Sequence, residues 1–415
     1  MDEEREMVLR MLKEGKISVE EADALLQELA DQSKEAPATE GGREEGRAAP
    51  SLGEDLRVEL RSVFKELMES IPKDVMHEIR RTREVFRPTF IEVMRGLRGL
   101  MEGRAETTAE EAMRPGETLD LRNAWGDVRI SAGDEGPMRL RAVKRVWSLT
   151  AEEAQREAEA LPIEVRRDGS SVVVHVPRPA GRRARVDFEI TVPKGVAARI
   201  DVAKGDLSLD GVAGAELHVA RGDVRIAGLE GPLRADLVSG DLEIRRVVGD
   251  VRLDIKSGDV AASDIRGRVE GRIINGDVAI QESGGAGLDL INGDVDLRRV
   301  RGPVAVTTKS GDVELVQSRS TDVKVHALSG DVEIDLEELV EGSVVAETIS
   351  GDITLAVPAD SRATIDASTR SGSISAGLPL TEQTTGFRSL RGVLNGPGAT
   401  VRLQATSGDV AVRRR

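Results

Sequence analysis

The sequence predicts a mainly β protein: a single-stranded, right- or left-handed β-solenoid (β-helix) with rungs of ~18 residues, preceded by an α-helical N-terminal region. Three observations support this fold class. From Gly205 to Gly351, a Gly-Asp pair followed by Val, Leu or Ile recurs at steps of 17 to 21 residues. Between these pairs apolar and polar residues alternate, which indicates strands with one buried face. Aromatic residues make up only 2% of the chain, which also has 43 glycines, as a thin aliphatic core with a tight turn at each rung requires.

The repeated Gly-Asp pairs define the rungs. They begin at Gly205, Gly222, Gly240, Gly258, Gly276, Gly293, Gly311, Gly330, Gly351 and Gly408, and Gly372-Ser373-Ile374 is a degenerate member. Each unit of a solenoid buries its apolar face only by stacking on its neighbours. In the rung that follows Gly240, we expect Leu242 and Ile244 to point inward and the segment 251–255 to return along the opposite face.

The chain divides by composition into five parts. We expect a helical hairpin module at 1–31, a flexible linker at 32–50 and an amphipathic helical segment at 51–104. An irregular β cap with a helical insertion, Thr150 to Leu161, follows at 116–200, and the solenoid repeats occupy 201–415.

Overall composition limits the possible functions. A net charge of −15 argues against a nucleic-acid partner, because such binding needs a basic face. The absence of cysteine excludes disulfides, thiolate metal sites and a cysteine nucleophile. Five of the first six residues are charged and no apolar core of a signal peptide follows, and no stretch approaches the roughly 20 apolar residues of a spanning helix. We therefore expect a cytoplasmic protein, with membrane association and export by another route left open.

The N-terminal helices are expected to bind protein partners, self-association included, because two short helices have little core of their own. Ser18 and Glu21 form a capping box at the start of the second helix. Farther along, the segment 75–101 carries basic residues at Arg80, Arg81, Arg83 and Arg87, so peripheral membrane contact is an alternative to an ordinary docking face. Acidic residues interspersed in this segment favour the docking face.

The segment from Val8 to Ala22, with Gly15-Lys16-Ile17-Ser18 followed by Glu20-Glu21-Ala22, resembles the short SHOCT-like N-terminal module of LiaX/YvlB-type envelope-stress proteins. The Ser/Asn-Gly-Asp-Val repeat, with its lead-in from Val192 to Gly195, resembles the bacterial "putative adhesin" β-strand-repeat family (DUF4097-like). This second resemblance spans about residues 116–415. It implies a β-solenoid and association with the cell envelope, and it transfers no catalytic residue.

The aspartate of each corner has two interpretations. Small polar residues with glycine suit a corner that needs φ > 0, and the carboxylate can accept hydrogen bonds from the backbone of its own loop. Alternatively, calcium could relieve the repulsion between stacked aspartates, but calcium-binding β-rolls carry two glycine-rich aspartate motifs per turn and this chain has one. The structural interpretation is favoured.

The motifs predict no catalytic, cofactor-binding or metal-binding residue, and no small-molecule substrate. The four histidines (His77, His175, His218 and His326) are not at zinc-site spacing, and no phosphate-binding loop is present. A carbohydrate-active site with paired carboxylates would be expected to interrupt the repeat, as at Leu336–Gly342 or Ala376–Pro397.

These observations favour a non-enzymatic scaffold or interaction protein with a β-solenoid display surface, in the envelope stress response or envelope organisation of bacteria. A surface adhesin exported without a standard signal peptide is one alternative, and a carbohydrate-active β-helix enzyme is a weaker one. Filament formation through a free edge of the C-terminal rung, Ser407–Val412, is disfavoured by the like charges of the three arginines from Arg413 to Arg415.

Overall fold

The computed structural model describes residues 100–133, 136–177 and 183–415. The chain separates into two compact units, Met1–Thr89 and Phe90–Arg415, and every described residue belongs to the second. The predictions for the hairpin module at 1–31, the linker at 32–50 and the helical segment up to residue 99 lie outside the described residues.

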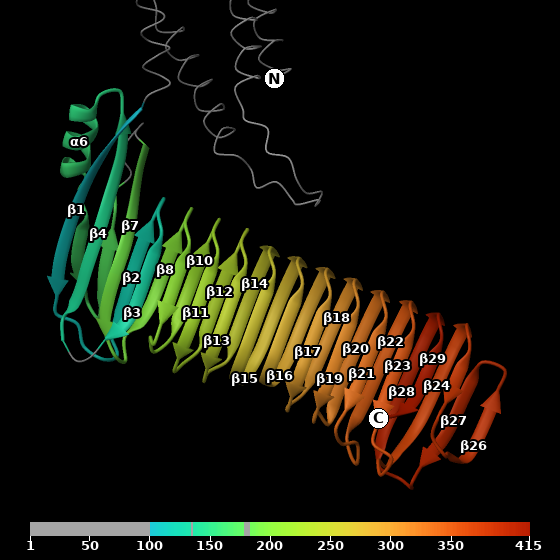
Figure 1. Ribbon diagram of the computed structural model, residues 1–415. Coiled ribbons are helices and arrows are strands. Elements are labelled where there is room, and N and C mark those ends of the chain that lie inside the picture. The colour runs from blue at the N-terminus through green and yellow to red at the C-terminus, as the bar shows by residue number, and fades with distance from the viewer. Residues whose placement is uncertain (1–99, 134–135, 178–182) are drawn as a thin grey trace, which may run out of the picture. The chain divides into compact units, whose positions relative to one another are not determined.

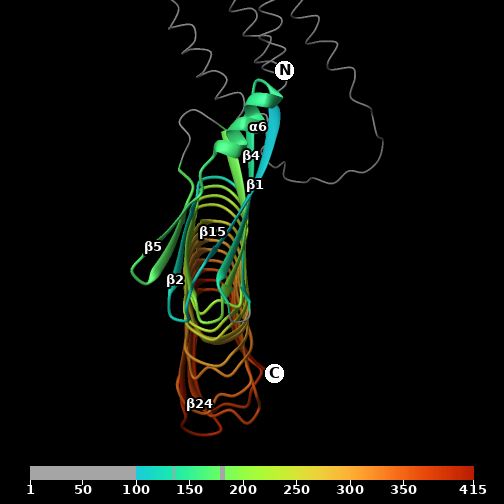
Figure 2. The ribbon, with the colours of Figure 1, turned by 90° about the vertical axis from the view of Figure 1, so that its left-hand side faces the viewer.

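The predicted β-solenoid is confirmed for the described part of the chain, whose strands form one 29-stranded hydrogen-bonded network (Figure 1). Successive rungs pair in parallel, and seen along the stack they overlie one another as flattened loops (Figure 2). Each rung contributes one strand to each of two faces, and a Gly-Asp corner joins the two strands. Two long strands, β15 (Val260–Asn275) and β16 (Val278–Asn292), run from one face to the other.

The strand that precedes each corner belongs to what we term the first face. In spatial order it comprises β6 (Ser171–His175), β2 (Thr118–Asn123), β8 (Ala197–Val202), β10 (Ala215–Val219), β12 (Leu233–Leu237), β14 (Val251–Ser257), the second halves of β15 and β16, β18 (Val304–Ser310), β20 (Asp322–Ser329), β22 (Ser343–Ser350), β28 (Ala399–Ser407) and β24 (Ala363–Ser371).

The strand that follows each corner belongs to the second face. In spatial order it comprises β7 (Arg183–Pro193), β3 (Val128–Gly133), β9 (Leu207–Asp210), β11 (Val224–Leu229), β13 (Leu242–Val247), the first halves of β15 and β16, β17 (Val295–Val300), β19 (Val313–Ser318), β21 (Val332–Leu336), β23 (Ile353–Val357), β29 (Val410–Arg414) and β25 (Ile374–Ala376).

The core is a stack of aliphatic side chains between the two faces. In the rung of β13 and β14, Leu242, Ile244 and Ile255 are at most 1% exposed, whereas the intervening residues face outward. This agrees with the alternation expected from the sequence. Because Val, Ile, Leu and Ala fill the narrow interior at every level, the core needs no large aromatic rings.

The N-terminal end is closed by antiparallel strands. β1 (Met101–Glu111) pairs with β4 (Met138–Ser148), which pairs with β7, and β5 (Glu164–Asp168) pairs with β6. The expected helical insertion corresponds to α6 (Ala151–Ala160), where the Thr150 hydroxyl accepts a hydrogen bond from the Glu153 amide at 3.2 Å.

One boundary predicted from the sequence is wrong. The helical segment expected at 51–104 includes residues 101–104, but these residues form the start of β1. Pairing with β4 and packing under α6 override the local helical pattern: a Cβ on Gly103 would lie 2.1 Å from the backbone of Ala154. Only glycine allows the strand and helix to approach so closely.

At the C-terminal end the order of the rungs in space departs from their order in the chain. The rung of β28 and β29, although last in sequence, lies between the rung of β22 and β23 and that of β24 and β25. The stretch 376–397 contains the hairpin of β26 (Thr381–Gly386) and β27 (Ser389–Leu394), and β27 pairs with β24.

The expectation that the C-terminal rung leaves a free edge is therefore wrong, because both of its strands are paired on both sides. Two of the three terminal arginines also differ from expectation, since they form ion pairs: Arg413 with Glu333 and Arg415 with Asp335 at 3.1 Å. They attach the end of the chain to an earlier rung and do not act as a repulsive charge cluster at an open edge.

Candidate functional site

Each Gly-Asp corner depends on its glycine for two reasons. At Gly276, φ is +143°, a backbone conformation that residues with a side chain rarely adopt. A Cβ there would also lie 2.0 Å from the carbonyl oxygen of Gly258 on the preceding rung. The same two conditions hold at the other Gly-Asp corners of the stack, with φ between 134° and 146°. Glycine therefore lets successive corners stack in direct contact.

The corner aspartates form a continuous ladder of hydrogen bonds along the stack. The backbone amide of each aspartate donates to the carboxylate of the aspartate on the preceding rung, at distances that run from 3.2 Å for Asp206 to Asp127 down to 2.7 Å for Asp409 to Asp352. The intermediate members are Asp223, Asp241, Asp259, Asp277, Asp294, Asp312, Asp331 and Asp352. This corrects the expectation that each carboxylate bonds its own loop: the contact joins different rungs.

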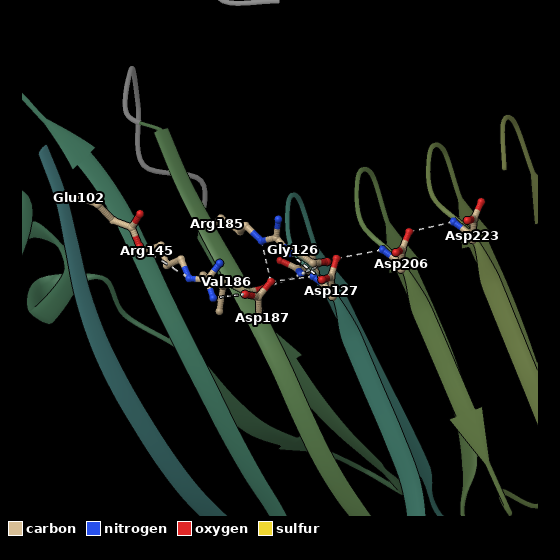
Figure 3. Close-up of polar contacts among 10 residues, drawn as sticks. Glu102, Gly126, Asp127, Arg145, Arg185, Val186, Asp187, Asp206 and Asp223 are labelled. Carbon is tan, nitrogen blue, oxygen red and sulfur yellow. Dashed lines mark hydrogen bonds and ion pairs between the residues drawn. The ribbon is translucent and has the colours of Figure 1, made fainter. Parts of the chain in front are cut away.

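The ladder begins at a cluster of arginines on the N-terminal cap (Figure 3). The Asp187 carboxylate accepts a hydrogen bond from the Asp127 backbone amide at 2.9 Å. The Arg185 guanidinium donates to the Asp187 carboxylate at 2.8 Å and to the Asp127 carboxylate at 2.6 Å. Arg145 lies 3.6 Å from Asp187. Burial alone would lower the pKa of Arg185. The hydrogen bond to Asp187 and the negative charge of Asp127 outweigh this effect and hold the pKa above its usual value. The arginines thus balance the negative charges of Asp187 and Asp127, the first two carboxylates of the ladder.

The only two tryptophans of the chain stack on each other beside this cluster. The rings of Trp125 and Trp147 are 5.4 Å apart, and the Lys204 amine lies 5.4 Å from the Trp125 ring. On the inner side, the Asn123 amide donates to the carbonyls of Gly126 and Val186, at 3.1 Å and 2.9 Å. These contacts hold the first corner against β7. The cluster of arginines and aspartates therefore has a structural role in the cap.

The described residues contain no group of three or more His, Asp or Glu side chains arranged to hold a metal ion. Two histidines instead contact single carboxylates on the first face: His218 lies 3.5 Å from Asp236, and His326 lies 3.2 Å from Glu347. His175 is on β6, and His77 lies outside the described residues.

A shallow groove of about 230 Å³ on the second face contains two carboxylates, Glu243 and Asp296. They occupy the same register position, three rungs apart, which corresponds to ~14 Å at the usual strand spacing. Glycosidase carboxylates lie roughly 5–9.5 Å apart. Each of these two is also bound to an arginine of its own strand, Arg245 or Arg298. The groove is therefore not arranged for glycoside hydrolysis.

A groove of about 700 Å³ lies on the first face, near the C-terminal end. It crosses β18, β20, β22, β28 and β24, with one wall formed by the register row that contains His326 and Glu347. The other wall is formed by residues two positions before each corner glycine: Lys309, Leu328, Ile349, Thr406 and Arg370. We call this feature the five-rung groove. The motifs of the sequence do not reveal this groove, although alignment of the repeats on their glycines places Leu328 and Ile349 at this outward position.

No helix among the described residues is long and apolar enough to cross a membrane. Comparison with known families matches residues 116–413 to a model described as Toastrack DUF4097, and residues 3–34 to a model described as a SHOCT-like domain. No curated protein matches the chain.

Several solved structures resemble the chain at low identity. A "putative cell adhesion protein" from Clostridium sporogenes is 10% identical, covers 75% of this chain and 100% of its own, and has a TM-score of 0.17. A "putative lipid binding protein" from Parabacteroides distasonis is 10% identical, with coverages of 74% and 96% and a TM-score of 0.32. A "putative adhesin" from Bacteroides fragilis is 12% identical, with coverages of 76% and 100% and a TM-score of 0.23. At such scores these likenesses support no argument about function.

Proposed function

Because the chain belongs to the Toastrack DUF4097 family over residues 116–413, we propose that it is a non-enzymatic scaffold whose solenoid faces display binding surfaces to other proteins. Both resemblances indicated by the motifs, the β-strand repeat and the SHOCT-like module, are confirmed by the family matches. The observation that carries the proposal is the way the outward carboxylates are used. Many of them bond to the next rung in the aspartate ladder or pair with arginines such as Arg199 and Arg252, and the two grooves described above bring no two carboxylates close together.

The proposal extends to the role of the N-terminal part and to the cellular process. The SHOCT-like segment at residues 3–34 would recruit a protein partner or a second copy of the chain, and the basic segment at 75–101 would permit peripheral contact with a membrane. Together with a long display surface, this arrangement suits the envelope stress response or the organisation of the envelope from its cytoplasmic side.

The experiment that tests this proposal is localisation in the native cell, by fractionation combined with protease treatment of intact cells. A scaffold acting from the cytoplasmic side is expected to be protected, in the cytosolic or inner-membrane fraction. Digestion by external protease would contradict that location and support a surface adhesin. A fragment starting at Leu100 retains β1 and serves as the control: loss of the inner-membrane fraction in this fragment would assign the membrane contact to the N-terminal part.

A further inference from the structure

The five-rung groove combines features that point to one kind of ligand. Its ends are marked by two cations, Lys309 and Arg370, and its middle by two exposed aliphatic side chains. Leu328 is 49% exposed and Ile349 is 51% exposed, and they lie on neighbouring strands, β20 and β22. An aliphatic centre between two cations is complementary to a ligand with an apolar middle and an anionic group at each end.

Some arginines of the first face are paired with carboxylates, such as Arg199 with Glu216 at 2.9 Å and Arg252 with Glu270 at 3.4 Å, whereas others in the described part, such as Arg272 and Arg402, have no ion pair. Lys309 and Arg370 differ from these by their position at the two ends of the groove. The side chains of Lys309 and Arg370 form no ion pair within the described ranges 100–133, 136–177 and 183–415. In a chain with a net charge of −15, two unpaired cations at the ends of one groove leave positive charge available to an anionic ligand.

The spacing of the groove sets the length of the ligand. Lys309 and Arg370 are four rungs apart in the stack, through Leu328, Ile349 and Thr406, which corresponds to ~19 Å at the usual strand spacing. An extended polypeptide advances ~3.3 Å per residue, so about six residues span this distance. Hydroxyl, imidazole and amide groups on the opposite wall, among them Thr307, His326 and Gln404, can hydrogen-bond a peptide backbone that runs along the groove. The same wall carries the Glu347 carboxylate, 3.2 Å from His326, which favours a ligand whose acidic groups are at its ends and not in its middle.

We propose that the five-rung groove binds an extended acidic peptide of a partner protein. A carboxylate at one end contacts Lys309, a carboxylate at the other end contacts Arg370, and an aliphatic side chain packs against Leu328 and Ile349. This inference rests on the proposed scaffold function and assigns that function to a definite surface.

A second copy of the chain is the main competing occupant. Phe387 lies at the tip of the β26–β27 hairpin and is 96% exposed. The Arg388 carbonyl accepts a hydrogen bond from the Thr369 amide at 3.1 Å, so this tip adjoins the Arg370 end of the groove. The positive charge at the groove ends favours a separate acidic ligand over a copy that presents the same cations, because like charges facing each other oppose association.

The test measures fluorescence anisotropy of the full-length chain with two labelled hexapeptides. One carries Glu at both ends with Leu in the middle, and the other carries Lys at both ends with the same middle. We expect the acidic peptide to bind about tenfold more tightly, a difference of about 1.4 kcal/mol. The double variant Lys309→Glu, Arg370→Glu should reverse this preference, and Leu328→Ser with Ile349→Ser should weaken both peptides.

Two matched controls occupy the same register position on rungs outside the groove, Lys256 and Val238. The variants Lys256→Glu and Val238→Ser should leave both affinities unchanged. Equal affinities for the two peptides, no binding of either, or a preference that the Lys309 and Arg370 reversals leave intact would overturn the proposal. Sedimentation that shows self-association abolished by Phe387→Ser would overturn it in favour of a second copy. Because these assays use purified protein, their failure leaves the localisation result, and with it the scaffold proposal, separately testable.

Discussion

Replacing the corner glycine Gly276 with alanine is the sharpest test of the stacking argument. The substitution has two separable costs. With φ at +143°, the backbone of alanine is strained by about 1–3 kcal/mol. In addition, its Cβ would lie 2.0 Å from the Gly258 carbonyl oxygen, whereas carbon and oxygen atoms in close contact are about 3.3–3.6 Å apart. The two rungs must therefore separate by more than about 1 Å at this corner.

Such a separation breaks the hydrogen bonds that join the two corners. The Gly258 amide donates to the Asn275 carbonyl at 3.0 Å, the Val260 amide donates to the Asp277 carbonyl at 2.8 Å, and the Asp277 amide donates to the Asp259 carboxylate at 2.9 Å. At about 1 kcal/mol each, the three bonds add about 3 kcal/mol to the cost of strain. We expect Gly276→Ala to lower the free energy of unfolding by about 4–6 kcal/mol.

Two other glycines separate the contributions. Gly396 has φ of +104° but no atom within 4 Å of its Cβ position, so Gly396→Ala should show the strain alone. Gly136 has neither a positive φ nor a close neighbour, and its replacement should be neutral or slightly stabilising. The assay is urea unfolding followed by circular dichroism, with hydrogen exchange at the corner amides because a solenoid can open locally. If Gly276→Ala costs no more than Gly396→Ala, the close approach of the rungs does not limit stability and the reasoning is wrong.

Three further predictions concern side chains and pH. Asp277→Ala should be about 1 kcal/mol less stable than Asp277→Asn at any salt concentration, because only Asn keeps the acceptor for the next rung; equal stabilities in urea unfolding would refute the ladder. Arg246 has φ of 56°, so Arg246→Gly should raise the free energy of unfolding by up to about 1 kcal/mol, whereas Gly at the adjacent Arg245, which lacks a positive φ, should lower it. The hydrogen bond from Arg141 holds the pKa of Glu106 below its usual value of 4.5. This ion pair therefore stabilises the fold fully above pH 4.5, and the stabilisation is lost as the pH falls from there through the lowered pKa of Glu106. Glu106→Gln should flatten the fall of the melting temperature in acid, and an unchanged acid profile would contradict this assignment.

The regular rungs could be predicted from the sequence because the information is local. Alternation places Leu242 and Ile244 inside, and the glycine and small polar residue of each corner specify the turn. The direction of the aspartate hydrogen bond could not be predicted in this way. A carboxylate two bonds from the backbone can reach its own loop or the next rung, and the choice depends on how closely the rungs stack, which the fixed glycine contact determines.

The order of the C-terminal rungs was also beyond the sequence pattern. Ser407-Gly408-Asp409-Val410 carries the same signature as the other corners, so local preference fits it equally well at any level of the stack. What decides its place is the hairpin of β26 and β27, which covers β24 and leaves the chain end to return beside β22. The groove depends on the same arrangement, because Thr406 and Arg370 become neighbours only when this rung is inserted.

Inserting this rung also explains the one corner that lacks aspartate. Gly372-Ser373 reads as a degenerate repeat in the sequence, but in space it is the last corner of the stack. Its amide donates to the Asp409 carboxylate at 2.7 Å, and no later corner follows that would need a carboxylate acceptor. At the opposite end an acceptor is required, and Asp187 supplies it from a strand without the repeat motif, with Arg185 and Arg145 balancing its charge. Each aspartate is therefore present where a following amide requires it, which favours a structural role for the ladder over a metal-binding one.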